Sequence, residues 1–175
     1  SPTTANYVIM ATITAPIILK LIPETPVLAA HFFVFYFGVV ADITPPVALA
    51  AYAGAAISGG NPLRTGVIAT RLAIAAFIVP YMVVLNPAML LINASLYQIV
   101  QFIITSLTGM FALACGLEGF MKTELPTWQR ILAAVGGLLL IHPALTTDLI
   151  GFALIGVVVV FQYGIKTGKD KLVTA

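Results

Sequence analysis

The sequence predicts an all-α integral membrane protein: a multi-span helical bundle with one discontinuous helix and a partial re-entrant hairpin at its N-terminal end. Of its 175 residues, 61% are hydrophobic and 8% are charged, whereas soluble domains are roughly half apolar and about a quarter charged. The mean hydropathy is +1.09, and the charges gather at the ends of apolar stretches. One of these, residues 27–60, exceeds the thickness of a bilayer but is interrupted at its centre by Thr44-Pro45-Pro46.

The first apolar stretch, residues 2–15, is predicted to be a helix with Ser1 as N-cap and a proline in its first turn. Pro16 is expected to bend or interrupt this helix, because proline lacks the N–H group that a helix interior uses. At about 1.5 Å per residue the segment covers roughly 20 Å, less than the ~30 Å hydrocarbon core. Because the chain starts in a polar tetrapeptide without an initiator Met, we expect a fragment of a longer membrane protein.

The break in the second stretch is the most informative feature of the chain. Pro45 and Pro46 have no N–H groups, so the carbonyls of Ala41 and Asp42 lose their usual helical donors. Thr44 precedes a proline and is therefore disfavoured in the α conformation. Unpaired backbone groups and a carboxylate persist inside a bilayer only where they face protein, water or an ion. Secondary transporters bind solutes and coupling ions at broken helices of this kind.

The rest of the chain is predicted as further apolar helices joined by polar turns. The first run of the last pair is barely long enough to cross a bilayer, so two full spans and a short hairpin both remain open for residues 131–163. We expect residues 1–92 to be part of a transport domain, residues 93–165 to add transmembrane helices, and residues 166–175 to form a polar cytoplasmic tail. The predicted helical ranges are 27–40 and 47–58 on the two sides of the break, about 70–91, about 96–119, 131–141 and 149–163.

The basic residues predict the orientation in the membrane. When successive loops are assigned to alternate sides, seven basic residues fall on one side and only Lys20 on the other. Cytoplasmic loops carry an excess of Lys and Arg, so the side with seven, and with it the C-terminus, is predicted to be cytoplasmic. These seven are Arg64, Arg71, Lys122, Arg130, Lys166, Lys169 and Lys171.

The break is expected to bind a cation. Carbonyl oxygens at Val40, Ala41 and Asp42 and the hydroxyl of Thr44 are the hard donors that an alkali cation needs. The alternative is a packing kink whose freed groups are bonded by neighbouring helices. For Asp42 itself the sequence leaves three roles open, namely ligand, proton relay and partner of a neighbouring backbone group.

Two helix starts are expected to bind an organic carboxylate. Thr3 and Thr4 supply hydroxyls at the start of the first helix, although such a pair alone is an ordinary cap. The N–H groups that follow Pro46, from Val47 onward, lie at the start of the second half-helix. Helix N-termini carry a partial positive charge that favours anions, so both starts are predicted to contribute to solute binding without a buried Lys or Arg.

Other functional classes find little support in the sequence. The basic residues form no patch with aromatics, so no nucleic-acid partner is expected, and a single cysteine, Cys115, allows no intramolecular disulfide. No nucleophile–base pair, glycine-rich phosphate loop or metal cluster is evident, so we expect neither an enzyme nor an organic cofactor. His31 is interpreted as a hydrogen-bonded structural histidine, while His142 and Asp148 are placed in an outer loop. A structural or assembly subunit that does not transport remains the alternative.

Four segments resemble the large membrane subunit of TRAP (tripartite ATP-independent periplasmic) transporters. The most specific contains Ile43-Thr-Pro-Pro-Val47, and the similarity continues through residues 77–80, 86–87 and 145–151, so it covers nearly the whole chain. The closest branch is that of the fused permeases that work with TAXI-type solute-binding proteins. The four segments are residues 1–5, 29–38, 43–50 and 61–66.

The resemblance implies an elevator-type permease of the bacterial inner (plasma) membrane, which imports an organic anion together with Na⁺. It implies a periplasmic solute-binding protein as partner, and the remaining permease segments or a small membrane subunit, all within the lipid bilayer. By this analogy residues 1–4 form the tip of the second re-entrant hairpin and residues 2–15 its outgoing arm. Na⁺ is then the ion expected at Val40, Ala41, Asp42 and Thr44, and the solute the anion expected at Thr3, Thr4, Pro46 and Val47.

Overall fold

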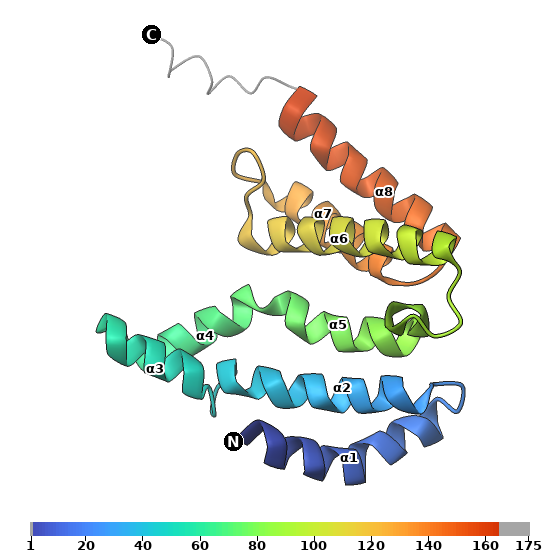
Figure 1. Ribbon diagram of the computed structural model, residues 1–175. Helices are drawn as coiled ribbons and strands as arrows, with labels where there is room; N and C mark the ends of the chain where they lie inside the picture. Colours follow the sequence, from blue (N-terminus) through green and yellow to red (C-terminus); the bar gives the residue numbers. More distant parts are fainter. Residues whose placement is uncertain (1, 165–175) are drawn as a thin grey trace. The chain divides into compact units, whose positions relative to one another are not determined.

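The computed structural model describes residues 2–164, and of Pro2 only the backbone. This part of the chain is built from helices (Figure 1), and no strand occurs within it. The predicted all-α fold class is therefore confirmed. The predicted Ser1 cap and the predicted tail 166–175 lie outside the described residues.

The chain forms two compact units that divide between Ser95 and Leu96. Each is described by itself, and the predicted functional division after residue 92 stays a prediction. The first unit consists of α1 (Pro2–Leu21), α2 (Val27–Val40), the 3₁₀ turn η1 (Ala41–Ile43), α3 (Leu49–Ser58), α4 (Pro62–Leu72), α5 (Ile74–Leu85) and the 3₁₀ turn η2 (Pro87–Leu90). The second consists of α6 (Leu96–Glu118), α7 (Thr127–Ile141), α8 (Leu145–Val159) and the π-helical turn η3 (Val160–Gly164).

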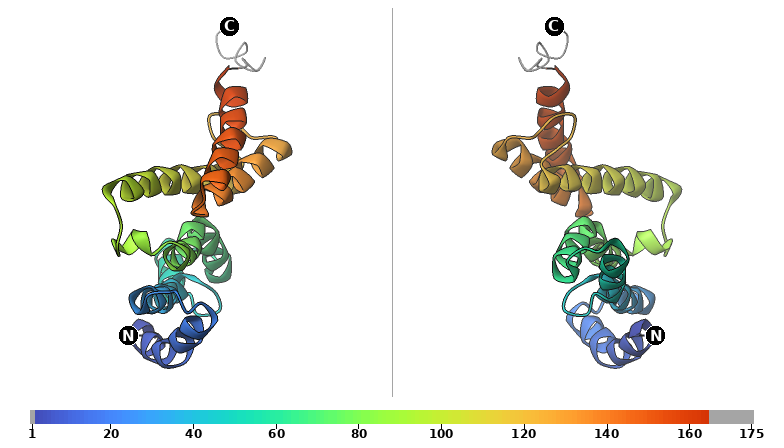
Figure 2. Two further views of the ribbon diagram at one scale, coloured as in Figure 1. Left: turned by 90° about the vertical axis from the view of Figure 1, so that its right-hand side faces the viewer. Right: turned by 90° about the vertical axis from the view of Figure 1, so that its left-hand side faces the viewer.

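Helix α1 continues through Pro16, so the predicted end of the first helix at residue 15 is wrong. Its apolar part, Thr3–Leu21, is 19 residues long and long enough to cross a membrane. A proline removes one helical hydrogen bond, whereas ending the helix in an apolar environment would leave several backbone groups unpaired. Helix α1 packs along α2 in all views (Figures 1 and 2) around a small core of Ala15, Ala30 and Val34.

Helix α2 covers the predicted range and ends at the predicted break, but the second half-helix begins at Leu49 rather than at residue 47. The delay has a local cause at Ala48, whose backbone is left-handed, with φ 39°. The N–H of Ala48 bonds backward to the carbonyls of Ala41 (3.3 Å) and Thr44 (3.0 Å). These bonds close the loop between the two halves before α3 can start.

The stretch predicted as one interrupted helix from residue 70 is a bent pair, α4 and α5, whose axes differ by 42°. Helix α4 starts earlier than predicted because Asn61 accepts a hydrogen bond from the N–H of Arg64 (3.0 Å) and Pro62 occupies the first turn. This is the usual N-cap and N1 arrangement. Pro80 lies inside α5 without ending it.

In the second unit, α6 and α7 approach closely at glycines. A Cβ atom placed at Gly109 would lie 2.7 Å from the Gly137 carbonyl oxygen, and one at Gly116 would lie 2.7 Å from that of Arg130. Small residues permit such contacts between membrane helices. Arg130 itself donates from Nη2 to the Leu117 carbonyl (2.7 Å), satisfying the C-terminal end of α6.

Residues 131–163, for which two full spans and a short hairpin were both left open, lie in two helices of unequal length. Helix α7 has 15 residues, whereas Leu145–Gly164 has 20 and is long and apolar enough to cross a membrane. Both helices begin one turn earlier than predicted, and Asp148 therefore lies in the first turn of α8, buried, rather than in a loop.

Length and composition single out three helices able to cross a membrane within residues 2–164, or four if the bent pair α4–α5 is one span. Large apolar side chains also point outward, as on Ile57 (90% exposed) and Leu107 (68%). Such exposure suits a lipid environment. These features agree with the predicted multi-span membrane protein.

Candidate functional site

The break between α2 and α3 is an ordered loop. The backbone of Thr44 is extended, with φ −112° and ψ 121°, as expected for a residue before proline. The Pro45–Pro46 peptide bond is cis. The hydroxyl of Thr44 donates to the Val40 carbonyl at 2.7 Å. A hydroxyl has one hydrogen and two lone pairs, so this bond leaves the oxygen of Thr44 able to accept from a donor or to ligate a cation.

Most carbonyls at the break are paired within the first unit. The Ala41 carbonyl loses Pro45 as a donor, as predicted, but is not left free, because it accepts the N–H groups of Thr44 (3.2 Å) and Ala48 (3.3 Å). The Pro46 carbonyl accepts from the hydroxyl of Tyr52 (3.3 Å). No hydrogen bond within residues 2–164 reaches the Asp42 carbonyl, which therefore remains the open backbone oxygen that the double proline predicted.

Asp42 presents a second open oxygen. Its Oδ2 accepts a long hydrogen bond from the hydroxyl of Thr3 (3.4 Å). Its Oδ1 is buried and has no hydrogen-bond partner among the described residues. Burying a carboxylate oxygen without a partner costs free energy that a cation or a proton would recover. Of the three predicted roles, the bond to a neighbouring backbone is not observed, and ligand and proton relay remain.

The contact of Thr3 with Asp42 brings two predicted sites together. Thr3 was assigned to the solute and Asp42 to the ion, yet the first turn of α1 lies against the end of α2. A Cβ atom placed at Gly38 would be 3.7 Å from the Thr3 carbonyl oxygen, an ordinary van der Waals distance, so Gly38 of α2 lies directly beside the first turn of α1. Thr4, by contrast, is exposed on α1.

The predicted N–H donors of the second half-helix lie further along the chain than expected. Pro46 and Val47 are exposed in the loop, and the N–H of Ala48 is already bonded. The first turn of α3 runs from Leu49 to Ala51, and no hydrogen bond from its N–H groups is observed among the described residues. The positive end of α3 is therefore formed by these groups. No contact joins Thr4 to Pro46 or Val47 in the part of the chain that the structure describes.

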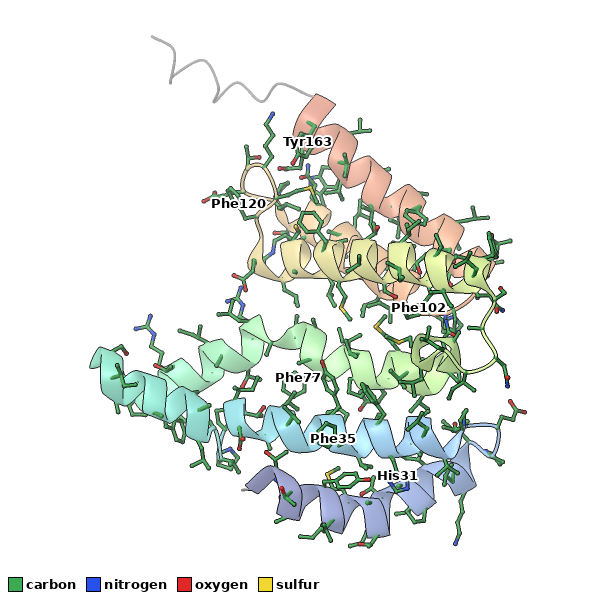
Figure 3. The ribbon with its side chains drawn as sticks, viewed as in Figure 1. His31, Phe35, Phe77, Phe102, Phe120 and Tyr163 are labelled. Carbon is green, nitrogen blue, oxygen red and sulfur yellow. The ribbon has the colours of Figure 1, made fainter. Side chains whose placement is uncertain are left out.

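Aromatic contacts hold α2 in place between α1 and α5. In Figure 3, His31 and Phe35 lie on α2, beside α1. The hydroxyl of Tyr7 is 3.1 Å from Nδ1 of His31, and the ring of Tyr7 packs edge to face against Phe35. The interpretation of His31 as a hydrogen-bonded histidine is therefore confirmed. On the other side, Phe37 packs against Phe77 of α5.

Three residues that the sequence did not single out support the break, namely Tyr52 of α3 and Gly66 and Thr70 of α4. The hydroxyl of Thr70 lies 3.3 Å from the Ile43 carbonyl, and a Cβ atom at Gly66 would lie 2.9 Å from Cγ of Pro45. The four-residue spacing places Gly66 and Thr70 on one face of a helix. That spacing was a signal in the sequence, but nothing in the sequence linked this face to the break.

The second unit contains two polar pairs, one part-buried and one buried. Nε2 of Gln101 donates to Oδ2 of Asp148 (3.1 Å), and Nε2 of Gln162 donates to Oε1 of Gln129 (2.7 Å). Both join neighbouring helices. His142 is exposed, and no group of three His, Cys, Asp or Glu side chains suited to a metal occurs within residues 2–164.

Comparison with known families identifies the family of the chain. Residues 2–98, more than half of the chain, match the family model of the tripartite ATP-independent periplasmic transporter, DctM component. The match contains the whole first unit described above, and α7 and α8 lie outside it. Searches of the curated proteins and of the solved structures gave no match. The chain thus belongs to the DctM-component family of TRAP transporters, a family of transporter permeases.

Proposed function

We propose that the chain is part of a Na⁺-coupled secondary transporter permease that imports an organic anion, a carboxylate, delivered by a periplasmic solute-binding protein. Family membership supports the permease assignment. The observation that carries the ion-binding part is the buried Oδ1 of Asp42, which lacks a partner among the described residues. It belongs to the same residue as the open carbonyl at the helix break.

A cation at this position would find several oxygen donors of the kind that hard ions prefer. Asp42 offers a carboxylate oxygen and a carbonyl. Thr44 offers the lone pairs of a hydroxyl whose hydrogen is given to Val40. The carbonyls of Val40 and Ala41 complete the proposed set, with the difference that each already accepts hydrogen bonds. We therefore assign the larger share of the Na⁺ affinity to Asp42 and Thr44.

The proposed anion lies near the starts of α1 and α3. The hydroxyls of Thr3 and Thr4 and the N–H groups beyond Pro46 and Val47 supply donors, and both helix starts favour negative charge. The bond from Thr3 to Asp42 gives a direct route for coupling. When Na⁺ neutralises the carboxylate, the repulsion between Asp42 and an incoming carboxylate falls, so ion binding favours solute binding.

The wider assembly follows from the same proposal. The remaining segments of the permease or a small membrane subunit complete the transport unit in the bacterial inner membrane, with a TAXI-type binding protein in the periplasm. The excess of Lys and Arg supports a cytoplasmic location for Arg64, Lys122 and the C-terminus.

The substitution Thr44→Val in the intact permease tests the ion site. It removes one hard donor and keeps the shape, while Thr44→Ser keeps the hydroxyl. Loss of a ligand interaction of ~1.5–3 kcal/mol raises the Na⁺ concentration for half-maximal uptake roughly 10- to 100-fold. This Na⁺ concentration should be lowest for the wild type, slightly higher for Thr44→Ser and highest for Thr44→Val.

Unchanged Na⁺ dependence in Thr44→Val, with normal expression, would count against the site. If uptake also survives Asp42→Asn, the break is a packing kink, and a structural or assembly role becomes the better interpretation. Because five carbonyls of the break are paired inside the first unit, a packing kink is a serious alternative, and the two substitutions distinguish it from an ion site.

A further inference from the structure

Helix α4 presents one face to the break. Thr70 is half-buried on this face, and its hydroxyl lies 3.3 Å from the Ile43 carbonyl and 3.0 Å from the Gly66 carbonyl. A bond to the carbonyl four residues earlier is common for threonine in membrane helices. The contact with Ile43, 27 residues away in sequence, is different, because it joins α4 to the backbone that leads into Thr44.

The same face contacts the other side of Thr44. Gly66 is buried, and a Cβ atom there would lie 2.9 Å from Cγ of Pro45 and 3.2 Å from Cε1 of Tyr52. Glycine is needed because any side chain would push the Pro45 ring away. Thr70 and Gly66 therefore hold the residues immediately before and after Thr44, one by a hydrogen bond and the other by close packing.

The Ile43 carbonyl belongs to the peptide group that supplies the N–H of Thr44. A hydrogen bond to this carbonyl fixes the plane of the peptide, and with it the direction of the Thr44 N–H and side chain. The N–H of Thr44 bonds to Ala41 (3.2 Å) and its hydroxyl to Val40 (2.7 Å). The bond from Thr70 thus supports the geometry of the whole turn from α4, a helix that contributes no proposed ligand.

We infer that Thr70 is a positioning residue for the cation site at the break. This inference rests on the proposed Na⁺ site at Asp42 and Thr44. Ion ligands must be held to within about 0.5 Å of their productive positions. A valine at position 70 has nearly the same shape as threonine but cannot donate to Ile43, so the peptide before Thr44 keeps only its N–H bond to Ala41 and the ligand oxygens are held less firmly.

The chain offers a matched control on the same helix. Thr65 also donates to the carbonyl four residues earlier, that of Asn61 (2.9 Å), and no contact of its hydroxyl with the break is observed among the described residues. Thr65→Val and Thr70→Val therefore remove the same kind of local bond. Only Thr70→Val also removes the bond to Ile43, and Thr70→Ser restores the donor.

The experiment measures Na⁺-dependent uptake and Na⁺-dependent thermal stabilisation of the intact permease for these variants. Thr70→Val is expected to raise the Na⁺ midpoint in both assays about two- to tenfold, the effect of one hydrogen bond. Thr70→Ser is expected within twofold of the wild type, and Thr65→Val unchanged. Uptake at saturating Na⁺ should retain the wild-type KM for the anion.

Other outcomes would overturn the inference. If Thr70→Val lowers the melting temperature or the uptake rate but leaves the Na⁺ midpoint unchanged, Thr70 only stabilises the fold. If Thr70→Val shifts the midpoint and Thr44→Val does not, Thr70 is itself the ligand.

Comparison of Thr44→Val with Thr70→Val separates this inference from the proposed function. If Thr44→Val raises the Na⁺ midpoint and Thr70→Val does not, the positioning role is refuted and the proposed ion site stands. If neither variant changes the Na⁺ midpoint, both the ion site and the inference are refuted. Should Thr70→Val fail to fold, Gly66→Ala tests the same face by displacing Pro45; it is expected to raise the Na⁺ midpoint, and an unchanged midpoint would refute the role of this face.

Discussion

The close contact of α6 with α7 predicts that a single added methyl group will strongly lower the stability of the protein. Gly137→Ala adds one methyl group at the centre of this crossing. The new Cβ atom would lie 2.5 Å from the Gly109 carbonyl oxygen and 2.8 Å from the Leu113 backbone nitrogen. Both neighbours are backbone atoms of α6, so no side-chain rotation relieves the overlap, and the two helices must move apart.

The size of the effect follows from the distance. The shorter contact is half an ångström below the 3.0 Å that real Cβ atoms keep. A gap of 0.5–1 Å loses a quarter to a half of the dispersion energy of each atom pair along the interface. Overpacking of a well-packed contact costs typically 1–3 kcal/mol. We expect Gly137→Ala to lower the stability by about 2–3 kcal/mol, because both atoms that the new methyl group meets are backbone atoms.

The measurement is the melting temperature of the intact permease in detergent, compared with Gly156→Ala. A Cβ atom at Gly156 of α8 meets nothing within 4 Å, and alanine in a helix is favoured over glycine by roughly 0.5–1 kcal/mol. Gly137→Ala should therefore lower the melting temperature, whereas Gly156→Ala should leave it unchanged or raise it. Equal melting temperatures for the two variants would show that α6 and α7 do not cross at Gly109 and Gly137, and the packing of the second unit would have to be revised.

Two further predictions concern topology and the solute. In a Cys115→Ala background, a cysteine at position 64 should react only after the membrane is permeabilised, and one at position 146 should react from outside; external labelling at position 64 reverses the proposed orientation. Thr4→Val should raise the uptake KM for the anion several-fold without moving the Na⁺ midpoint, because Thr4 is exposed and has no observed hydrogen bond to Asp42 within residues 2–164. Thr3→Val should change both the KM and the Na⁺ midpoint, since the hydroxyl of Thr3 bonds to the carboxylate of Asp42. A change in the Na⁺ midpoint alone would mean that Thr3 is part of the ion site and not of the solute site.

The break in the second helix could be predicted from sequence because its cause is local. A proline has no N–H group wherever the chain places it, so the end of α2 at Val40 follows from Pro45 and Pro46. Helix α6 was equally predictable, since 23 consecutive residues without a proline form one uninterrupted apolar run. That the carbonyl of Asp42 is unpaired among the described residues was predictable for the same reason, because Pro46 has no N–H group to donate to it.

Helix boundaries that depend on competing hydrogen bonds were not predictable. Pro16 was expected to bend or interrupt α1, and the helix was expected to end at residue 15, but a helix end in apolar surroundings leaves more groups unpaired than one proline does. The start of α3 moved to Leu49 because Ala48 turned its N–H toward Ala41 and Thr44. The helix α8 began at Leu145, which placed Asp148 in a buried position beside Gln101. Each outcome depends on an acceptor several residues away or on another helix.

The sequence alone determined that the chain lies in a membrane, that one helix is broken, and that Thr3, Asp42 and Thr44 are polar groups at helix ends, because composition and missing donors are properties of single residues. Only the tertiary structure decided which of these groups meet. Thr3 reaches Asp42 across 39 residues and Thr70 reaches Ile43 across 27. Contacts over such separations form only when helices pack, and their partners are selected by the shape of the whole unit, in which Gly66 lets α4 approach the ring of Pro45.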